Sequence, residues 1–467
     1  MADRTPDQPG DPDGHDGPGE DNPFKGTPFE QLFGQLGGQL GGQFGGAGGQ
    51  LPDFSALMGQ MQAFLQPYDG PVNWGLAHDI ARRTTAQEPD PTPGRADRDR
   101  VADSVRLADH WLDAMTPLPS GVTIGAAWSR AEWVEQTMDV WKVLVGPVAH
   151  HVTGAVDNAL GGQLGGLPEQ LKGMEQMLGP LTGMFSQLGG SMFGQQVGSA
   201  LGGLSQEVLS ASDIGLPLGP AGMAALVTSN VTAFCEGLDV GEDDVVLYLA
   251  LRECAHQRLF AHVPWLRQHL ISSVEDYGRG MTIDVAGIES KLQGLDPTDP
   301  SGLQEALTGG LFEPEQTPAQ KAALERLETT LALVEGWVDE VVGQATAPRM
   351  PAAAKLQEAV RRRRAAGGPA EQTFAALVGL ELRPRRLRDA SALWGSLRSR
   401  LGADERDAVW AHPDLLPSAA DLDDPLGFKA DVEEPAEMSD AEFDAELSKL
   451  LDGDQPDGPD GPDDKRE

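Results

Sequence analysis

The sequence has few cysteines, no long apolar run and little basic charge, and each shortage excludes a class of protein. Cys235 and Cys254 are the only two cysteines among 467 residues, too few for a disulfide framework or a cysteine-built zinc site. No run of 18 apolar residues occurs, and the N-terminus lacks the basic flank and apolar core of a signal peptide. We therefore expect a cytoplasmic protein in a reducing compartment, with no membrane insertion.

Basic residues are half as frequent as acidic ones, 35 against 72, which gives a formal net charge of −37. Both termini are strongly acidic, and the body between them is also acidic. Binding to nucleic acid needs a basic face that neutralises phosphates, so we expect no nucleic acid partner. We expect the partner to be a peptide or protein of unknown identity. The one basic run, Arg361–Arg364, is predicted to be the solvated end of a helix, with a phosphate or an acidic partner as the alternative contact.

Alternating β-branched runs are also scarce, and only Gly121–Ile124 and Met281–Val285 are candidates for short strands. Apolar residues recur instead at three- and four-residue steps, so we predict a mainly α fold with at most short strands. Tryptophans at helical spacing are expected in its core. The predicted helices cover roughly 71–86, 97–115, 128–146, 167–188, 194–210, 219–236, 243–263, 317–343, 351–366, 370–379, 384–401 and 404–410.

Composition divides the chain into three parts. Residues 1–50 are rich in Pro and Asp, then in Gly and Gln, and are predicted to be disordered, followed by a helical body over 51–420. Residues 421–467 form an acidic, mostly disordered tail with eighteen acids and four bases. Within it, Phe443, Leu447 and Leu450 recur at helical steps, which predicts a short acidic helix able to dock on a partner or on basic residues of the body.

The predicted helix 243–263 carries the sequence R-E-C-A-H, with Glu253 and His256 within one turn of each other. Zinc peptidases place H-E-x-x-H on such a helix, because two His four residues apart reach one metal and the Glu activates a bound water. Here Arg252 stands at the first His position, and a guanidinium cannot ligate zinc. The helix 317–343 carries Glu335 near its middle, in the sequence E-G-W-V-D.

These motifs, with S-D-I-G-L-P-L-G-P at 212–220, L-E-L-R-P-R-R-L-R-D-A-S-A-L-W at 380–394 and A-V-W-A-H-P-D-L-L-P at 408–417, make the chain resemble the zincin-like zinc-dependent metallopeptidases or hydrolases of actinobacteria. The resemblance implies a multi-helix zincin-like architecture and zinc as cofactor. It also implies Glu253 as catalytic base and His256 and Glu335 as metal ligands. Asp339 would support the ligands or, with Arg252, substitute for the metal's charge.

Three interpretations of the site stay open from the residues alone. A metal could be held by His256 and Glu335 with His262 as a substitute ligand, although six residues rotate His262 well away on a helix. Arg252 could instead replace the metal by pairing with Glu335 or Glu253. In the third interpretation, Glu253 and His256 are an ordinary pair on a helix surface. Cys254 faces away and is predicted to be a buried thiol.

Two functions follow from these interpretations. The first is a zinc-dependent metallopeptidase-like hydrolase with a degenerate site, and the second is an inactive relative that acts as a binding or scaffold protein. Because Arg252 replaces a metal ligand, the sequence leaves open whether the protein is an enzyme. In the first two interpretations the two motif helices pack side by side and bring His256 close to Glu335.

Overall fold

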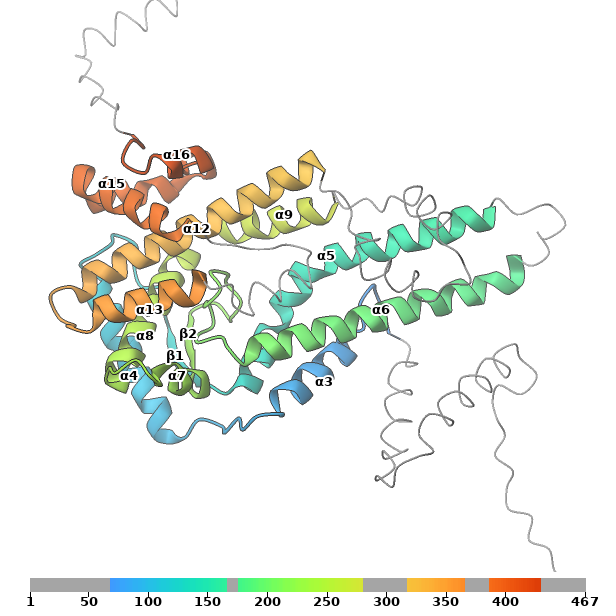
Figure 1. Ribbon diagram of the computed structural model, residues 1–467, viewed down its shortest axis with the longest axis horizontal. Coiled ribbons are helices and arrows are strands. Elements are labelled where there is room, and N and C mark those ends of the chain that lie inside the picture. Colours follow the sequence, from blue (N-terminus) through green and yellow to red (C-terminus); the bar gives the residue numbers. More distant parts are fainter. Residues whose placement is uncertain (1–67, 166–174, 280–316, 366–385, 430–467) are drawn as a thin grey trace, which may run out of the picture. The chain divides into compact units, whose positions relative to one another are not determined.

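Helices make up most of the structure, a computed structural model that describes residues 68–165, 175–279, 317–365 and 386–429 (Figure 1). These residues belong to one compact unit, Ala63–Glu467, and the described part contains just two short strands beside the helices, so the mainly α prediction is confirmed. The predicted tail 1–50, most of the tail 421–467, the strand at 281–285 and the helix at 370–379 lie outside the described residues. The elements in chain order are α3 (Trp74–Thr85), α4 (Arg95–Leu112), β1 (Ile124–Trp128), α5 (Arg130–Gly165), α6 (Glu175–Ser205), β2 (Met223–Val227), α7 (Thr228–Cys235), α8 (Glu242–His262), α9 (Leu266–Arg279), α12 (Pro318–Thr346), α13 (Ala353–Ala365), α15 (Leu387–Ala408), the 3-10 turns η2 (Val409–Ala411) and η3 (Pro413–Leu415), and α16 (Ala419–Asp423).

Strands β1 and β2 pair in parallel, with Ile124 opposite Met223 and Trp128 opposite Val227. Helices α4, α7 and α8 pack around this pair (Figure 1). The helix predicted over 219–236 is therefore wrong in its first half, which contains strand β2, and only Thr228–Cys235 is helical. A five-residue apolar run such as M-A-A-L-V fits a buried strand or a buried helix equally well, so pairing with β1 decides its conformation.

Helix α6 is continuous from Glu175 to Ser205, where the sequence predicted a break around the glycines near 190. Its glycines recur every fourth residue on the face that packs against α3. A Cβ atom at any of them would collide with α3 or the residues just before it: at Gly194 with the Asn73 carbonyl, at Gly198 with the Ala77 carbonyl. The glycines thus permit close helix packing instead of ending the helix. This stripe comprises Gly190, Gly194, Gly198 and Gly202.

The core contains four fully buried tryptophans, which confirms the expected role of these residues. Trp74 and Trp111 are partly buried and pack against the same core. Within the described ranges, no helix has an apolar stretch long enough to span a bilayer. The four buried residues are Trp133, Trp141, Trp337 and Trp394.

The two motif helices begin and end close to the predicted positions. Thr317 caps α12 by accepting a hydrogen bond from the Gln320 amide, and Pro318 occupies the first turn. Helix α8 ends at His262, just before the Val263-Pro264 pair. Asp243 lies inside the first turn of α8, where a carboxylate interacts favourably with the helix dipole.

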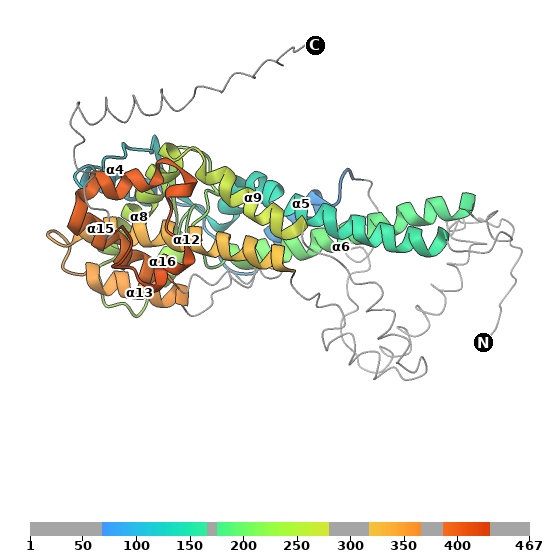
Figure 2. The same cartoon turned by 90° about the horizontal axis from the view of Figure 1, so that it is seen from above.

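Helices α8, α12 and α13 pack against one another, and α15 covers α12 (Figures 1 and 2). Gly336 lies at the crossing of α12 and α15, where an added Cβ would meet the backbone of Ala390 and Ser391. The glycine that follows Glu335 therefore sets how closely these helices approach. This arrangement encloses the motif residues between three helices.

Candidate functional site

Glu335 on α12 lies directly against Arg252 and His256 on α8. The Arg252 Nη2 atom is 2.6 Å from Glu335 Oε2, and the His256 Nε2 atom is 2.9 Å from Glu335 Oε1. Four residues separate Arg252 from His256, so both side chains project from the same face of α8. All three residues are buried, with 5 %, 1 % and 0 % of the surface of Arg252, His256 and Glu335 exposed. The predicted packing of the two motif helices is confirmed.

Both nitrogens of the His256 ring are engaged in hydrogen bonds. The Nδ1 atom lies 2.9 Å from the Arg252 carbonyl oxygen. The Nε2 atom lies 2.9 Å from Glu335 Oε1. Neither ring nitrogen is therefore left open toward a metal.

Arg364 reaches the same carboxylate as Arg252 and His256. The Arg364 Nη2 atom on α13 lies 2.9 Å from Glu335 Oε1. Burial alone would raise the pKa of Glu335, but Arg364, His256 and Arg252 outweigh it and lower the pKa to about 2. Glu335 is thus ionised at neutral pH, and both of its oxygens contact a guanidinium group.

Asp339, one turn after Glu335 on α12, links the cluster to residues of α13 and α15. It accepts hydrogen bonds from Ser391 Oγ at 2.9 Å, from Gln357 Nε2 at 3.0 Å and from Arg361. Its Oδ1 atom is 3.9 Å from Arg252 Nη1. Asp339 therefore ties α13 and α15 to the cluster and adds a negative charge beside Arg252.

The basic run of α13 contradicts the prediction of a solvated helix end. Arg361 and Arg364 pair with Asp339 and Glu335, and Arg363 Nη1 lies 2.8 Å from Asp213 Oδ2. Only Arg362 is largely exposed, with 77 % of its side chain accessible. Three of the four arginines point inward because each forms an ion pair with a carboxylate from a distant part of the chain. The arginine run was the sequence signal for this contribution, but nothing local revealed its partners.

Glu253 forms hydrogen bonds with residues other than those that contact Glu335. Its carboxylate accepts hydrogen bonds from the Ser212 amide at 3.0 Å, from Ser212 Oγ at 3.1 Å and from Gln257 Nε2 at 3.0 Å. The residue is fully buried, and burial raises its pKa. Glu253 therefore anchors the segment that contains Ser212, a residue whose role the sequence did not predict.

The remaining candidate residues lie apart from the cluster. His262 is exposed at the end of α8, and its Nε2 atom is 3.3 Å from the Ser120 carbonyl, so it does not serve as a substitute ligand beside buried His256. Cys254 is a buried thiol that donates to the Val105 carbonyl at 3.7 Å, as predicted. The interpretation of Glu253 and His256 as a surface pair is wrong, because both are buried.

The residues present do not fit a zinc ion. Across the described ranges, no group of three or more His, Cys, Asp and Glu side chains is arranged to hold a metal. A divalent ion at Glu335 would have to sit beside Arg252 and Arg364, two guanidinium groups that cannot ligate it and would repel it strongly in a buried setting.

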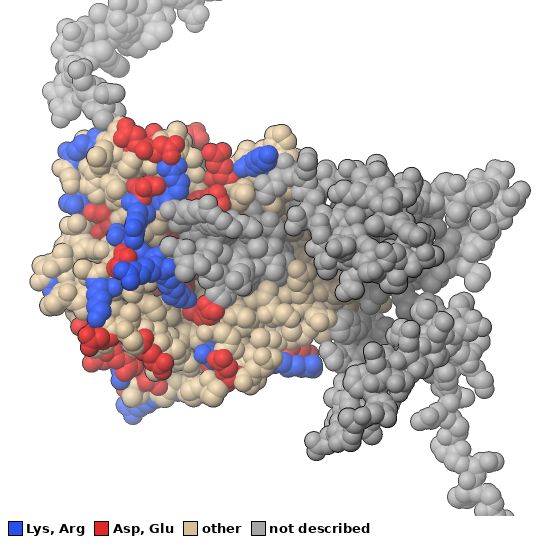
Figure 3. Space-filling view, viewed as in Figure 1, with Lys and Arg blue, Asp and Glu red and all other residues tan. Residues whose placement is uncertain are grey.

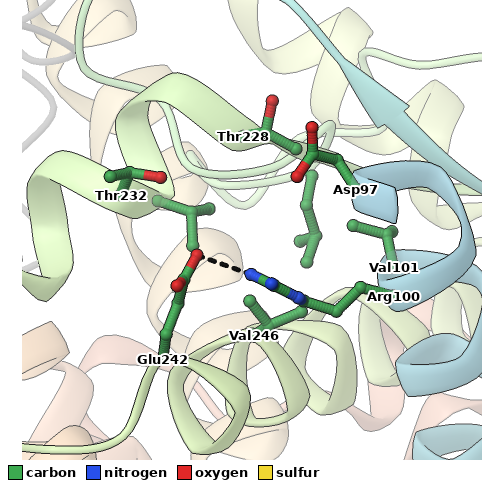
Figure 4. A pocket seen from close by; sticks show the side chains of 9 residues that line it. Asp97, Arg100, Val101, Thr228, Thr232, Glu242 and Val246 are labelled. Atoms are coloured by element: carbon green, nitrogen blue, oxygen red, sulfur yellow. Dashed lines mark hydrogen bonds and ion pairs between the residues drawn. The ribbon is translucent and has the colours of Figure 1, made fainter. Parts of the chain in front are cut away.

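A separate small pocket lies between α4, α7 and the start of α8 (Figure 4). It encloses about 20 Å³, and the Arg100 guanidinium donates to Glu242 Oε1 at 2.7 Å across it. Thr228, Thr232 and Asp97 also line it (Figure 4). Such a volume holds about one water molecule, so this pocket does not extend the Glu335 cluster.

A crystal structure of a proposed hydrolase with a novel fold from Chloroflexus aurantiacus superimposes with a TM-score of 0.52 at 20 % identity. The match covers 76 % of this chain and 96 % of that one, and at this identity it shows a shared fold alone. No curated protein matches the sequence significantly.

The family model of zincin-like metallopeptidases matches residues 72–428. This range includes every helix of the Glu335 cluster and the segment that binds Glu253. The chain therefore belongs to the zincin-like metallopeptidase family.

Proposed function

We propose that a buried arginine and carboxylate cluster replaces the catalytic metal in this protein, which acts as a binding or scaffold member of its family. The observation that carries the proposal is the coordination of Glu335. Its Oε2 atom accepts from Arg252, and its Oε1 atom accepts from His256 and lies 2.9 Å from Arg364. Both oxygens of this carboxylate are thus in contact with a guanidinium group, Oε2 with that of Arg252 and Oε1 with that of Arg364.

The location of Arg252 supports this substitution. Arg252 and His256 are spaced like the two His of H-E-x-x-H, and both contact Glu335. The Arg252 guanidinium therefore lies where the side chain of the first His would project. Its permanent positive charge, with that of Arg364, compensates the buried carboxylates as a divalent ion would.

The hydrogen bonds of Glu253 support the same conclusion. A general base needs a carboxylate that is directed at a reacting water. Both oxygens of Glu253 instead accept hydrogen bonds from Ser212, and one also accepts from Gln257. A structural role for Glu253 explains these contacts without any catalytic step.

Zinc titration tests the proposal, with the melting temperature as readout, because a ligand that binds only the folded state raises it. We expect no rise for the wild type, a small rise for Arg252→His, and a larger rise for Arg252→His combined with Arg364→Gln. The double change is needed because Arg364 would still occupy Glu335 in the single variant. The matched control is Arg362→Gln, an exposed arginine of the same helix.

Stoichiometric zinc binding by the wild type that disappears in His256→Ala would overturn the proposal. It would favour the alternative, a zinc-dependent metallopeptidase-like hydrolase, which the family membership supports. That alternative also requires peptide hydrolysis that is lost in Glu253→Gln. We further propose a cytoplasmic setting, an actinobacterial origin and a peptide or protein partner, on the basis of the two cysteines, the sequence resemblance and the acidic charge.

A further inference from the structure

We propose that one buried water molecule bridges Tyr248 and Arg252 on α8 to Asp339 on α12. The site lies beside the Glu335 cluster, at the end of the Arg252 guanidinium that does not contact Glu335. The inference rests on the proposed function in one respect, because it takes Arg252 to lie in the cluster without a metal. Three buried polar atoms, one from each residue, carry it.

Arg252 and Asp339 each leave one polar atom without a hydrogen bond to the described residues. Arg252 donates to Glu335 from Nη2, and its Nη1 atom has no partner there. Asp339 accepts its side-chain hydrogen bonds from α13 and α15 at Oδ2 alone, and its Oδ1 atom has none. These two unpaired atoms lie 3.9 Å apart, too far for a direct hydrogen bond and near enough for one water molecule to contact both.

The Tyr248 hydroxyl is the third such atom. Tyr248 lies one turn before Arg252 on α8, so both side chains project from the same face of the helix. The residue is 1 % exposed, and within the described part of the chain its hydroxyl meets no partner with hydrogen-bond geometry. Burial raises the pKa of Tyr248 to about 12, and of the charges that act on it Arg252 lowers this pKa and Asp339 raises it. The hydroxyl therefore lies in the field of the same two charged groups.

Buried polar atoms need partners that surface atoms obtain from the solvent. Figure 3 shows Lys and Arg side chains next to Asp and Glu side chains on the surface, where bulk water solvates them. Arg252 and Asp339 are buried and have no such access. Folded proteins pair nearly all buried polar atoms, and they use an ordered water where no protein group serves. A resident water molecule would supply the missing bonds.

The chemistry of the three atoms selects water over an ion. Arg252 Nη1 only donates, Asp339 Oδ1 only accepts, and the Tyr248 hydroxyl does either. Asp339 would repel an anion at this position, and Arg252 would repel a cation. Water accepts from Arg252 and Tyr248 and donates to Asp339, which gives it the three hydrogen bonds typical of a buried water.

Such a water adds a second link between α8 and α12 beside the ion pair of Arg252 with Glu335. It binds the guanidinium at Nη1 while Nη2 lies 2.6 Å from Glu335 Oε2. The direction of the Arg252 side chain is then fixed at both ends of its charged group.

The sign of the effect of Tyr248→Phe distinguishes a bridged hydroxyl from an isolated one. If the hydroxyl binds the water, its loss should raise the unfolding equilibrium constant about two- to tenfold. The control is Ser229→Ala on α7, which removes another buried hydroxyl that lacks a partner in the described residues. It should leave the constant unchanged or lower it, because the cost of an unsatisfied group is removed. A Tyr248→Phe variant as stable as the wild type, or more stable, would overturn the inference.

A high-resolution crystal structure of the full-length wild type tests the water itself. We expect a water peak within about 3.2 Å of Tyr248 Oη, Arg252 Nη1 and Asp339 Oδ1. A direct hydrogen bond between Arg252 and Asp339, or an ion at this position, would overturn the inference. Zinc binding by the wild type would overturn the proposed function, whereas a zinc-free cluster without this water would overturn the present inference alone.

Discussion

Arg252 and Glu335 are separated by 83 residues of sequence, yet their charged groups lie 2.6 Å apart in a buried pair. This pair joins α8 to α12 at the position where the resemblance to zinc peptidases implies a metal. Two buried opposite charges stabilise a fold only when both are present, since either one alone is a large desolvation cost. The pair is therefore the most sensitive point of the cluster.

Removing Arg252 should destabilise the protein strongly. Arg252→Ala leaves Glu335 with one fewer cation in a buried setting, and breaking such a pair from one side costs about 3–5 kcal/mol. The measurement is the free energy of unfolding in urea. Arg362→Ala, which removes an exposed arginine, should stay within about 0.5 kcal/mol of the wild type. Equal effects of the two changes would contradict the assignment of Arg252 as the buried charge substitute.

Stability should fall in acid because of Glu335. Its folded pKa is about 2, below the ordinary 4.5, so its contribution is fully present above about pH 4.5 and is lost as the pH falls toward 2. We expect the free energy of unfolding of the wild type to decrease over this window more steeply than that of Glu335→Gln. Asp139→Asn, at an exposed residue of α5, should keep the wild-type slope. Parallel slopes for the wild type and Glu335→Gln would show that Glu335 titrates normally.

Glu253 should tolerate an amide but not truncation. Burial raises its pKa, so the neutral and nearly isosteric Glu253→Gln should fold with a similar or higher melting temperature at neutral pH. Glu253→Ala deprives the buried Ser212 amide of its acceptor and should cost about 1–3 kcal/mol. If Gln destabilised the fold as much as Ala, the ionised carboxylate itself would be required.

The glycine stripe of α6 gives a test of helix packing with an internal control. Gly198→Ala places a methyl group against the Ala77 carbonyl and should cost about 1–3 kcal/mol through overpacking. Gly203→Ala, on the same helix, meets no atom within 4 Å and should be neutral or stabilising by up to about 1 kcal/mol. Thermal unfolding of both variants distinguishes these outcomes. A stabilising Gly198→Ala would mean that α3 and α6 do not approach closely.

The sequence alone determined the features that depend on neighbouring residues. The bounds of α8 and α12 follow from Pro264 and from the Thr317 cap, which act within one helical turn, and the prediction is correct to within a few residues. Helical spacing also predicted that Arg252 and His256 share a face, and the motifs on α8 and α12 predicted that these helices meet.

Tertiary structure decided what depends on distant partners. Pairing with β1 turned Met223–Val227 into a strand, and contact with α3 kept α6 continuous through its glycines. The sequence offers Arg364 many carboxylates, and the packing of the helices selected Glu335. It likewise offers Glu253 many hydrogen-bond donors, and the packing selected Ser212. A charged group is buried only where the fold supplies a partner of opposite charge or a set of hydrogen bonds, and that partner is fixed by the course of the whole chain, which local periodicity does not encode.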